Sequence, residues 1–183
     1  TGSFGKHFVR QVIAKYKPRK LIIFSRDELK QYEMAQVFPQ DRYPFMRYFI
    51  GDVRSADRLE MAMRDVDYVV HAAALKHVSI AEYNPFECIA TNVLGAENVV
   101  QAAIRRGVKR VVALSTDKAA NPVNLYGASK LAADKIFVAA NNLSGADGCR
   151  FARGIGQGIK EGRQLLAKAL AGLSEGHAAA GAQ

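Results

Sequence analysis

The chain has 183 residues, of which 49% are hydrophobic and 23% are charged, and this composition predicts a globular domain with a buried core. No apolar run reaches the length of a membrane span and no signal peptide is recognisable, so we expect a cytoplasmic protein. The formal net charge is +9, but the basic residues are scattered without interleaved aromatic side chains. This pattern argues against nucleic-acid binding and suits phosphorylated ligands.

Strands alternate with helices along the chain, which is typical of a parallel α/β sheet. We therefore predict a Rossmann-like, doubly wound parallel sheet, incomplete at its amino terminus because no strand precedes Thr1. The first helix is indicated by an apolar stripe at Val9, Val12, Ile13 and Tyr16. Strands are expected at 20–25, 48–50, 67–71 and 110–114, and further helices at 26–37, 55–64, 85–106 and 126–142.

The first residues match the second half of a glycine-rich dinucleotide fingerprint. In Thr1-Gly2-Ser3-Phe4-Gly5, the first glycine allows the backbone to approach a pyrophosphate, and the second allows close helix packing. The helix that follows directs its amino-terminal N–H groups at the same phosphates. The sequence therefore predicts cofactor contacts from Thr1, Gly2, Ser3, Phe4 and Gly5.

A second cofactor signal follows the strand at 20–25. An NAD-specific site places a carboxylate there, whereas this chain has Ser25 and Arg26, with Lys30 one helical turn on. Cations at this position suit the 2′-phosphate of NADP. The alternative is that Ser25 only caps a helix and Arg26 is solvated.

The ends of the next two strands carry weaker signals. Asp52 and Val53 suit the adenine of a dinucleotide, although a capped turn explains them as well. The small residues Ala72, Ala73 and Ala74 allow the phosphate and ribose of a cofactor to approach. Lys76 and His77 then lie in a loop that faces the same crevice, as candidate substrate contacts.

No metal site is expected. Cys88 and Cys149 are far apart and form no Cys-x-x-Cys motif, and His71 and His77 have no third ligand at metal-binding spacing. We interpret the cysteines as buried or half-buried thiols in a reducing compartment. The histidines are more simply explained as packing or loop residues.

The strongest chemical signal comes after the apolar strand at 110–114. Ser115-Thr116-Asp117-Lys118 follows it directly, and Tyr126 and Lys130 lie one turn apart on the next helix. The charge of Lys130 favours the tyrosinate, so Tyr126 is a candidate proton acceptor. The simpler alternatives are a solvated turn for Asp117 and Lys118 and a strand-end cap for Thr116.

The composition changes after about residue 150. We expect a boundary between a nucleotide-binding domain at 1–150 and a divergent tail at 151–183 that is rich in alanine and glycine. A helix is expected near 159–170, and the low-complexity run from His177 to Gln183 predicts poor order.

Together these residues resemble the extended short-chain dehydrogenase/reductases. Within that family the chain is most similar to the inverting UDP-N-acetylglucosamine 4,6-dehydratases of pseudaminic acid and polysaccharide biosynthesis. The resemblance covers roughly residues 1–150. It rests on the segments 1–6, 25–30, 51–54, 72–78, 82–85, 91–93 and 115–130. The Thr-Asp-Lys triplet distinguishes this branch from related dehydratases and epimerases.

The resemblance implies an NADP-dependent 4,6-dehydration with inversion at C5. Tyr126 takes the C4 hydroxyl proton as hydride leaves for NADP, and Thr116 bonds the C4 oxygen. Lys118, partly desolvated, removes the C5 proton, and Asp117 protonates the departing C6 hydroxyl. Lys130 holds the nicotinamide ribose. The implied partners are a UDP-sugar substrate and, for the full-length parent, further copies of itself.

The chain also departs from that family. The first strand, the first fingerprint glycine and the Arg-Tyr-Gly-Asn segment after Phe151 are missing, as is the lobe that grips the UDP-sugar. We therefore expect a partial form that is a marginal fold and a poor enzyme by itself. The alternatives are another NADP-dependent nucleotide-sugar epimerase or reductase, and an inactive nucleotide-binding fragment.

Overall fold

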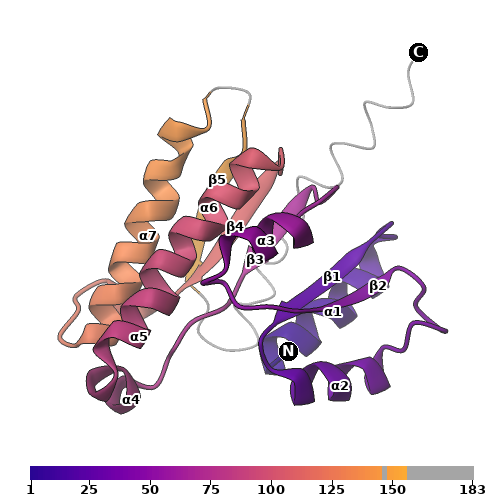
Figure 1. The fold of residues 1–183 in the computed structure, drawn as a ribbon, viewed down its shortest axis with the longest axis horizontal. Coiled ribbons are helices and arrows are strands. Elements are labelled where there is room, and N and C mark those ends of the chain that lie inside the picture. The colour runs from indigo at the N-terminus through magenta and orange to yellow at the C-terminus, as the bar shows by residue number, and fades with distance from the viewer. Residues whose placement is uncertain (146–147, 156–183) are drawn as a thin grey trace.

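A computed structural model describes residues 1–145 and 148–155. Helices and parallel strands alternate as predicted (Figure 1). The first half of the chain forms α1 (Ser3–Lys15), β1 (Leu21–Ser25), α2 (Glu28–Val37), β2 (Met46–Ile50), α3 (Ala56–Ala62) and β3 (Tyr68–His71). The second half forms α4 (Val78–Tyr83), α5 (Pro85–Ile89), the π-helical turn η1 (Ala90–Leu94), α6 (Gly95–Arg105), β4 (Arg110–Ser115), the 3₁₀ turn η2 (Asp117–Ala119), α7 (Leu125–Leu143) and β5 (Arg150–Ile155).

The strands form two parallel sheets rather than one. β1 pairs with β2, with Leu21 opposite Met46, and β4 lies between β3 and β5, with Arg110 opposite both Tyr68 and Arg150. In the described residues no strand joins β1 to β3. The prediction of a parallel α/β fold is confirmed.

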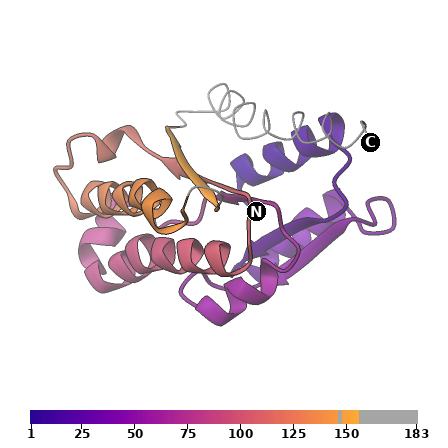
Figure 2. The ribbon, with the colours of Figure 1, turned by 90° about the horizontal axis from the view of Figure 1, so that it is seen from above.

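Each sheet has its own hydrophobic core. The small core consists of Val9, Met34, Phe38 and Met46, to which Leu21 and Ile23 of β1 add partly buried side chains. The large core contains most of the buried side chains of α3, α6, α7, β4 and β5, among them Leu59, Met63, Val99, Val111, Phe137 and Phe151. In Figure 2, α6 and α7 lie side by side over the second sheet, and the first fifty residues form the opposite end of the molecule.

The long helix predicted at 85–106 is interrupted. Between α5 and α6 the chain makes the π-helical turn η1, which contains the fully buried Asn92. Its side chain bonds outside the helix, as described below. The first residue of α6 is Gly95, and a larger residue would not fit there because its Cβ would lie 2.8 Å from Val53 Cγ2. A π-bulge of this kind is common at functional sites.

β5 crosses the domain boundary expected between residues 150 and 151. It pairs with β4 along its whole length, from Arg150 to Ile155. The helix expected near 159–170 and the low-complexity run to Gln183 lie outside the described residues. Within the described part of the chain, no helix is long and apolar enough to cross a membrane.

Candidate active site

The predicted cofactor-binding residues gather around one cavity of about 1840 Å³. It opens at the carboxyl ends of β1, β2 and β3, the edge at which α/β sheets bind ligands. Lys76 lines it, whereas His77 and the residues predicted for catalysis do not. The lining includes every predicted cofactor contact outside α7, namely Thr1, Gly2, Ser3, Phe4, Gly5, Ser25, Arg26, Lys30, Asp52, Val53, Ala72, Ala73 and Ala74.

The glycine turn leads into α1 at the mouth of this cavity. Gly2 precedes the first helical residue, Ser3, and its backbone is extended. A Cβ added at Gly2 or Gly5 meets no atom within 4 Å, so both positions face open space. The close packing predicted for Gly5 is not made by the described residues. The free N–H groups of the first helical turn remain available for an anion.

The two predicted phosphate contacts, Arg26 and Lys30, lie at the mouth, and each is already paired. Arg26 Nη1 lies 3.5 Å from Asp52 Oδ2, and Lys30 Nζ lies 2.8 Å from Asp27 Oδ2. Asp27 also caps α2 by accepting a hydrogen bond from Lys30 N at 2.9 Å. The cap of α2 is therefore Asp27 and not Ser25.

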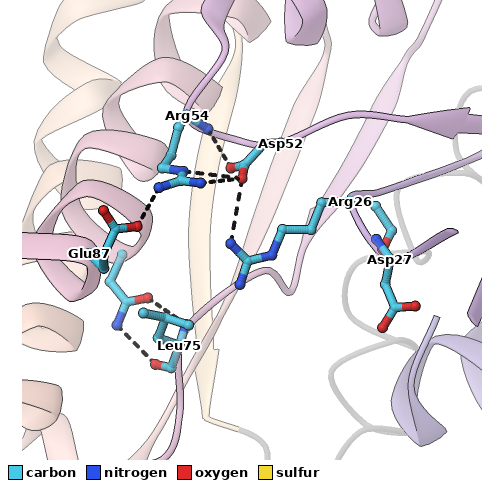
Figure 3. Close-up of polar contacts among 8 residues, drawn as sticks. Arg26, Asp27, Asp52, Arg54, Leu75 and Glu87 are labelled. Carbon is cyan, nitrogen blue, oxygen red and sulfur yellow. Dashed lines mark hydrogen bonds and ion pairs between the residues drawn. The ribbon is translucent and has the colours of Figure 1, made fainter. Parts of the chain in front are cut away.

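A charged network follows β2 (Figure 3). Arg54 Nε and Nη2 lie 3.1 and 3.0 Å from Asp52 Oδ2, and Arg54 Nη1 lies 2.5 Å from Glu87 Oε2. Burial acts to raise the pKa of Asp52, but the hydrogen bonds and charge of Arg54, together with the charge of Arg26, hold this pKa below its usual value. Asp52 thus stays ionised between two arginines, and it also caps its own turn by accepting from Arg54 N.

Val53 and the three alanines lie where the sequence placed them, at the strand ends. Val53 is 7% exposed and packs in the large core, where Asn98 Nδ2 donates to its carbonyl at 3.0 Å. Ala72 and Ala73 are exposed beyond β3. Their small side chains leave the mouth of the cavity open, as predicted.

The substrate candidates and the buried histidine behave differently. Lys76 is exposed in the loop after β3, and His77 is the exposed residue that precedes α4, a helix that was not predicted. His71 is buried, its ring centroid lies 5.4 Å from that of Phe137, and burial together with the charge of Lys130 lowers its pKa to about 3. His71 is therefore a neutral packing residue.

The Thr116–Lys118 triplet forms an exposed turn at the end of β4. Thr116 caps this turn, and its Oγ1 donates to Asp117 Oδ1 at 2.9 Å. This bond is the largest cause of the lowered pKa of Asp117, and Lys118 Nζ lies 3.9 Å away. The Lys118 side chain is 56% exposed, so the expected partial desolvation is not seen without a ligand.

Tyr126 and Lys130 share a buried face of α7, one turn apart. Lys130 Nζ donates to the carbonyl of Leu114 at 2.7 Å. Burial lowers the pKa of Lys130, and the negative charge of Asp134 offsets part of this effect. Burial also raises the pKa of Tyr126, while a hydrogen bond with the Thr116 side chain acts in the opposite direction. The phenol is therefore protonated at neutral pH in this state.

Gly127 lets α7 approach the triplet. A Cβ at Gly127 would lie 2.6 Å from the carbonyl oxygen of Lys118 and 3.1 Å from Pro122 Cβ. The absent side chain thus brings the first turn of α7, with Tyr126, against the Thr116–Lys118 turn. Asn124 fixes this start of the helix by accepting from Gly127 N at 2.8 Å.

Asn92 connects the cavity to α7, and sequence reasoning did not single out its role. Its Oδ1 accepts from Leu75 N at 2.8 Å, and its Nδ2 donates to Leu75 O at 3.1 Å and Ser129 Oγ at 2.9 Å (Figure 3 shows the Leu75 bonds). Ser129 in turn donates to the carbonyl of Tyr126. The sequence signal that could have indicated this role is the polar side chain of Asn92 among the apolar residues of a helical segment.

A second buried group lies beneath Lys130. The carboxylate of Asp134 accepts from Ser115 Oγ and from Arg153 Nη1, the latter at 3.2 Å, and Asp134 is 3% exposed. Asp134 follows Lys130 by one turn on the same face of α7. The three residues fasten β4, α7 and β5 together just below the predicted catalytic turn.

This arrangement defines a class of protein. Parallel strands with a glycine turn before the first helix, a cavity that includes the carboxyl ends of β1, β2 and β3, and a Tyr-x-x-x-Lys pair on α7 define a short-chain dehydrogenase/reductase fold. Within this class, the chain belongs to the polysaccharide biosynthesis protein family, whose pattern it matches over residues 1–153.

A curated relative supports this assignment. The chain is 65% identical over 151 residues to an inverting UDP-N-acetylglucosamine 4,6-dehydratase from Campylobacter jejuni serotype O:2. The match covers 82% of this chain and 44% of that enzyme, so the chain spans less than half of the curated relative.

Solved structures give the same result. Pen from Bacillus thuringiensis superposes with a TM-score of 0.79 at 41% identity, covering 84% of this chain and 47% of that one. DesIV from Streptomyces venezuelae, a dTDP-glucose 4,6-dehydratase solved with bound NAD, superposes with a TM-score of 0.70 at 31% identity, covering 83% of this chain and 52% of that one.

Proposed function

We propose that this chain is the cofactor-binding part of an enzyme that catalyses the 4,6-dehydration of UDP-N-acetylglucosamine, a UDP-N-acetylhexosamine, with inversion at C5. The observation that carries the proposal is the turn Thr116-Asp117-Lys118, packed against Tyr126 at the end of β4. It places a hydroxyl, an acid, an amine and a phenol at one strand end. The similarity to an inverting dehydratase supports the same reaction.

The residues present fit a nicotinamide dinucleotide. The glycine turn offers free helix N–H groups, the cavity is open at Gly2 and Gly5, and Arg26 and Lys30 supply cations at its mouth. Bound there, a nicotinamide would supply the acceptor for hydride from sugar C4 and the donor of hydride to C6. Lys130, which is buried on α7, would hold the nicotinamide ribose.

Two side chains handle the first proton. Tyr126 takes the proton of the C4 hydroxyl during oxidation, and Thr116 donates to the C4 oxygen. For this, Thr116 must leave Asp117, to which it donates here. Since that bond is the largest cause of the lowered pKa of Asp117, its loss raises this pKa toward the usual value, and Asp117 must still take up a proton before it acts as an acid.

The second half of the reaction falls to Lys118 and Asp117. The C4 ketone acidifies the C5 proton, which Lys118 removes, and Asp117 protonates the C6 hydroxyl as it departs as water. Lys118 is half exposed here, so covering by the sugar would supply the desolvation that a neutral amine needs. Lys76 and His77, exposed beside the mouth, are the proposed substrate contacts.

The expected product tests this function. We would join residues 1–153 to the parts of the C. jejuni dehydratase that lie outside the matched region, giving a chimeric protein. With UDP-N-acetylglucosamine and NADP it should release a 4-keto-6-deoxy sugar nucleotide without net formation of NADPH, as followed by NMR and absorbance. Steady accumulation of NADPH, or a simple C4 epimer, contradicts the proposed reaction.

The cofactor preference gives a second test. We propose NADP because Arg26 and Lys30 are the charged side chains after β1 that face the mouth, with Asp27 engaged by Lys30. In the chimeric protein, Arg26→Asp should weaken NADP binding relative to NAD by roughly tenfold or more, the value of one hydrogen bond to a charged group. Isothermal titration calorimetry measures both affinities.

The matched control is Arg10→Asp, which makes the same charge change on α1, at an exposed residue outside the cavity lining. It should leave the ratio of the two affinities unchanged. Equal affinity of the unsubstituted protein for NADP and NAD would show that Arg26 does not select the cofactor.

A further inference from the structure

Two side chains of α7 hold two successive residues at the end of β4. Lys130 Nζ donates to the carbonyl of Leu114 at 2.7 Å. One helical turn further along the same face of α7, the carboxylate of Asp134 accepts a hydrogen bond from Ser115 Oγ. The chain passes directly from Ser115 into the Thr116–Lys118 turn, so these two contacts determine where that turn lies against α7.

Asp134 and Lys130 are also opposite charges inside the fold. In the described part of the chain, Asp134 is the one buried carboxylate, at 3% exposed, and Lys130 is the one buried lysine, at 7%. Burying a charge is costly unless an opposite charge lies nearby. Arg153 on β5 gives Asp134 a partner, with Nη1 at 3.2 Å from Oδ2, but its side chain is 48% exposed and therefore screened by solvent. The partner of Asp134 within the interior is Lys130.

The charge of Asp134 opposes the effect of burial on Lys130. Burial lowers the pKa of Lys130, and the negative charge of Asp134 raises it. His71 on β3 stays neutral, because burial and the charge of Lys130 lower its pKa to about 3. The other titratable or charged groups that face this part of α7 are Glu82 on α4, Cys88 on α5, Asp117 and Lys118 in η2, Tyr126 on α7 and Arg153 on β5. Both carboxylates of this set are exposed.

We propose that Asp134 is a positioning residue for Lys130: its buried carboxylate keeps the Lys130 amine a cation and, through Ser115, holds the end of β4 against α7. The inference rests on the proposed function, in which a cationic Lys130 holds the nicotinamide ribose and favours the tyrosinate of Tyr126. Asp134 acts through Lys130 and is not itself a catalytic residue.

The test follows the charge of Lys130 in the 183-residue chain. With lysine labelled with ¹³C at Cε, the Lys130 signal is assigned by its absence in Lys130→Arg and reports the loss of the proton as the pH rises. In Asp134→Asn the side chain can still accept from Ser115 but has no charge. The midpoint of the Lys130 titration should therefore fall by about one pH unit or more, so that the ammonium is lost at a lower pH.

Three further variants separate the charge of Asp134 from its packing. Ser115→Ala removes the bond between Asp134 and β4 but no charge, so it should lower the melting temperature and leave the Lys130 midpoint unchanged. Asp117→Asn removes an exposed, solvent-screened carboxylate after β4 and should also leave the midpoint unchanged. Asp134→Glu keeps the charge and should keep the midpoint near that of the unsubstituted chain.

The chimeric protein links this charge to the reaction. If Lys130 must be a cation for catalysis, the decline of kcat/KM at high pH should begin about one pH unit lower in Asp134→Asn than in the unsubstituted chimera. A lowered Lys130 midpoint in a chimera that forms no dehydration product supports the effect of Asp134 on Lys130 and contradicts the proposed function. The two failures are therefore distinguishable.

Two results would overturn the inference. One is an unchanged Lys130 midpoint in Asp134→Asn, and the other is an equal fall in Ser115→Ala, which would make the lost contact and not the lost charge the cause. If Asp134→Asn does not fold with Arg153 unpaired, the double variant Asp134→Asn, Arg153→Gln carries neither charge. A midpoint equal to that of Arg153→Gln alone would then overturn the inference in the same way.

Discussion

Lys118→Ala in the chimeric protein is expected to stop proton exchange at sugar C5 while leaving oxidation at C4 intact. Lys118 is the amine of the turn after β4, and Asp117 is assigned to protonate the C6 hydroxyl, so Lys118 is the group proposed to accept the proton from C5 once the sugar covers it. Removing a general base typically slows a reaction by about 10²–10⁴-fold. Deuterium incorporation at C5 from D₂O measures this step.

Tyr126→Phe provides the contrast, because Tyr126 acts earlier. Loss of the Tyr126 hydroxyl should block hydride transfer to NADP, and therefore both the oxidation at C4 and the proton exchange at C5. Lys135→Ala, at an exposed position of α7 outside the cavity lining, is the control and should change neither. Deuterium exchange at the unsubstituted rate in the Lys118→Ala protein would show that another group is the base.

Phe137→Ala is expected to destabilise the 183-residue chain by about 3–5 kcal/mol, the usual cost of removing a buried aromatic side chain. Phe137 is 1% exposed at the centre of the large core, and its ring lies 5.4 Å from His71 and 6.4 Å from Phe151 between centroids. A loss of this size is comparable to the whole stability of a small domain. Urea unfolding followed by circular dichroism measures it.

The neighbouring residue supplies the control. Val138 is 51% exposed on the same helix, so Val138→Ala should change the free energy of unfolding only slightly. The higher helix propensity of alanine acts in favour of the variant. If Phe137→Ala unfolds at the same urea concentration as the unsubstituted chain, the large core is not what stabilises this sheet.

Much of this architecture is visible in the sequence because its signals are local. β4 is predictable from the unbroken apolar run at 111–114, and the start of α7 from the Tyr126 motif and its preceding turn. The glycine turn, Arg26 and Asp52 follow strand ends, and parallel strands bring their ends to one edge. The cavity lined by these residues is therefore the part of the site that a sequence defines best.

The parts that were missed depend on contacts between distant residues. Arg54 and Glu87 are 33 positions apart, and Asn92 and Ser129 are 37 apart, so no pattern in either segment indicates the partner. The π-helical turn η1 arises because Asn92 bonds to the loop at Leu75 and to α7, which overrides the helical propensity of the segment. Contacts between residues that are far apart in the sequence determine these parts of the site.

The division of the interior into two cores has a consequence for cooperativity. Val9, Met34, Phe38 and Met46 stabilise one sheet, and the cluster around Phe137 stabilises the other. Phe24 of β1 packs against the large core and so connects the first sheet to it. Each half can therefore open and close by its own equilibrium, and a single free energy of unfolding describes the chain only when both halves lose their structure together.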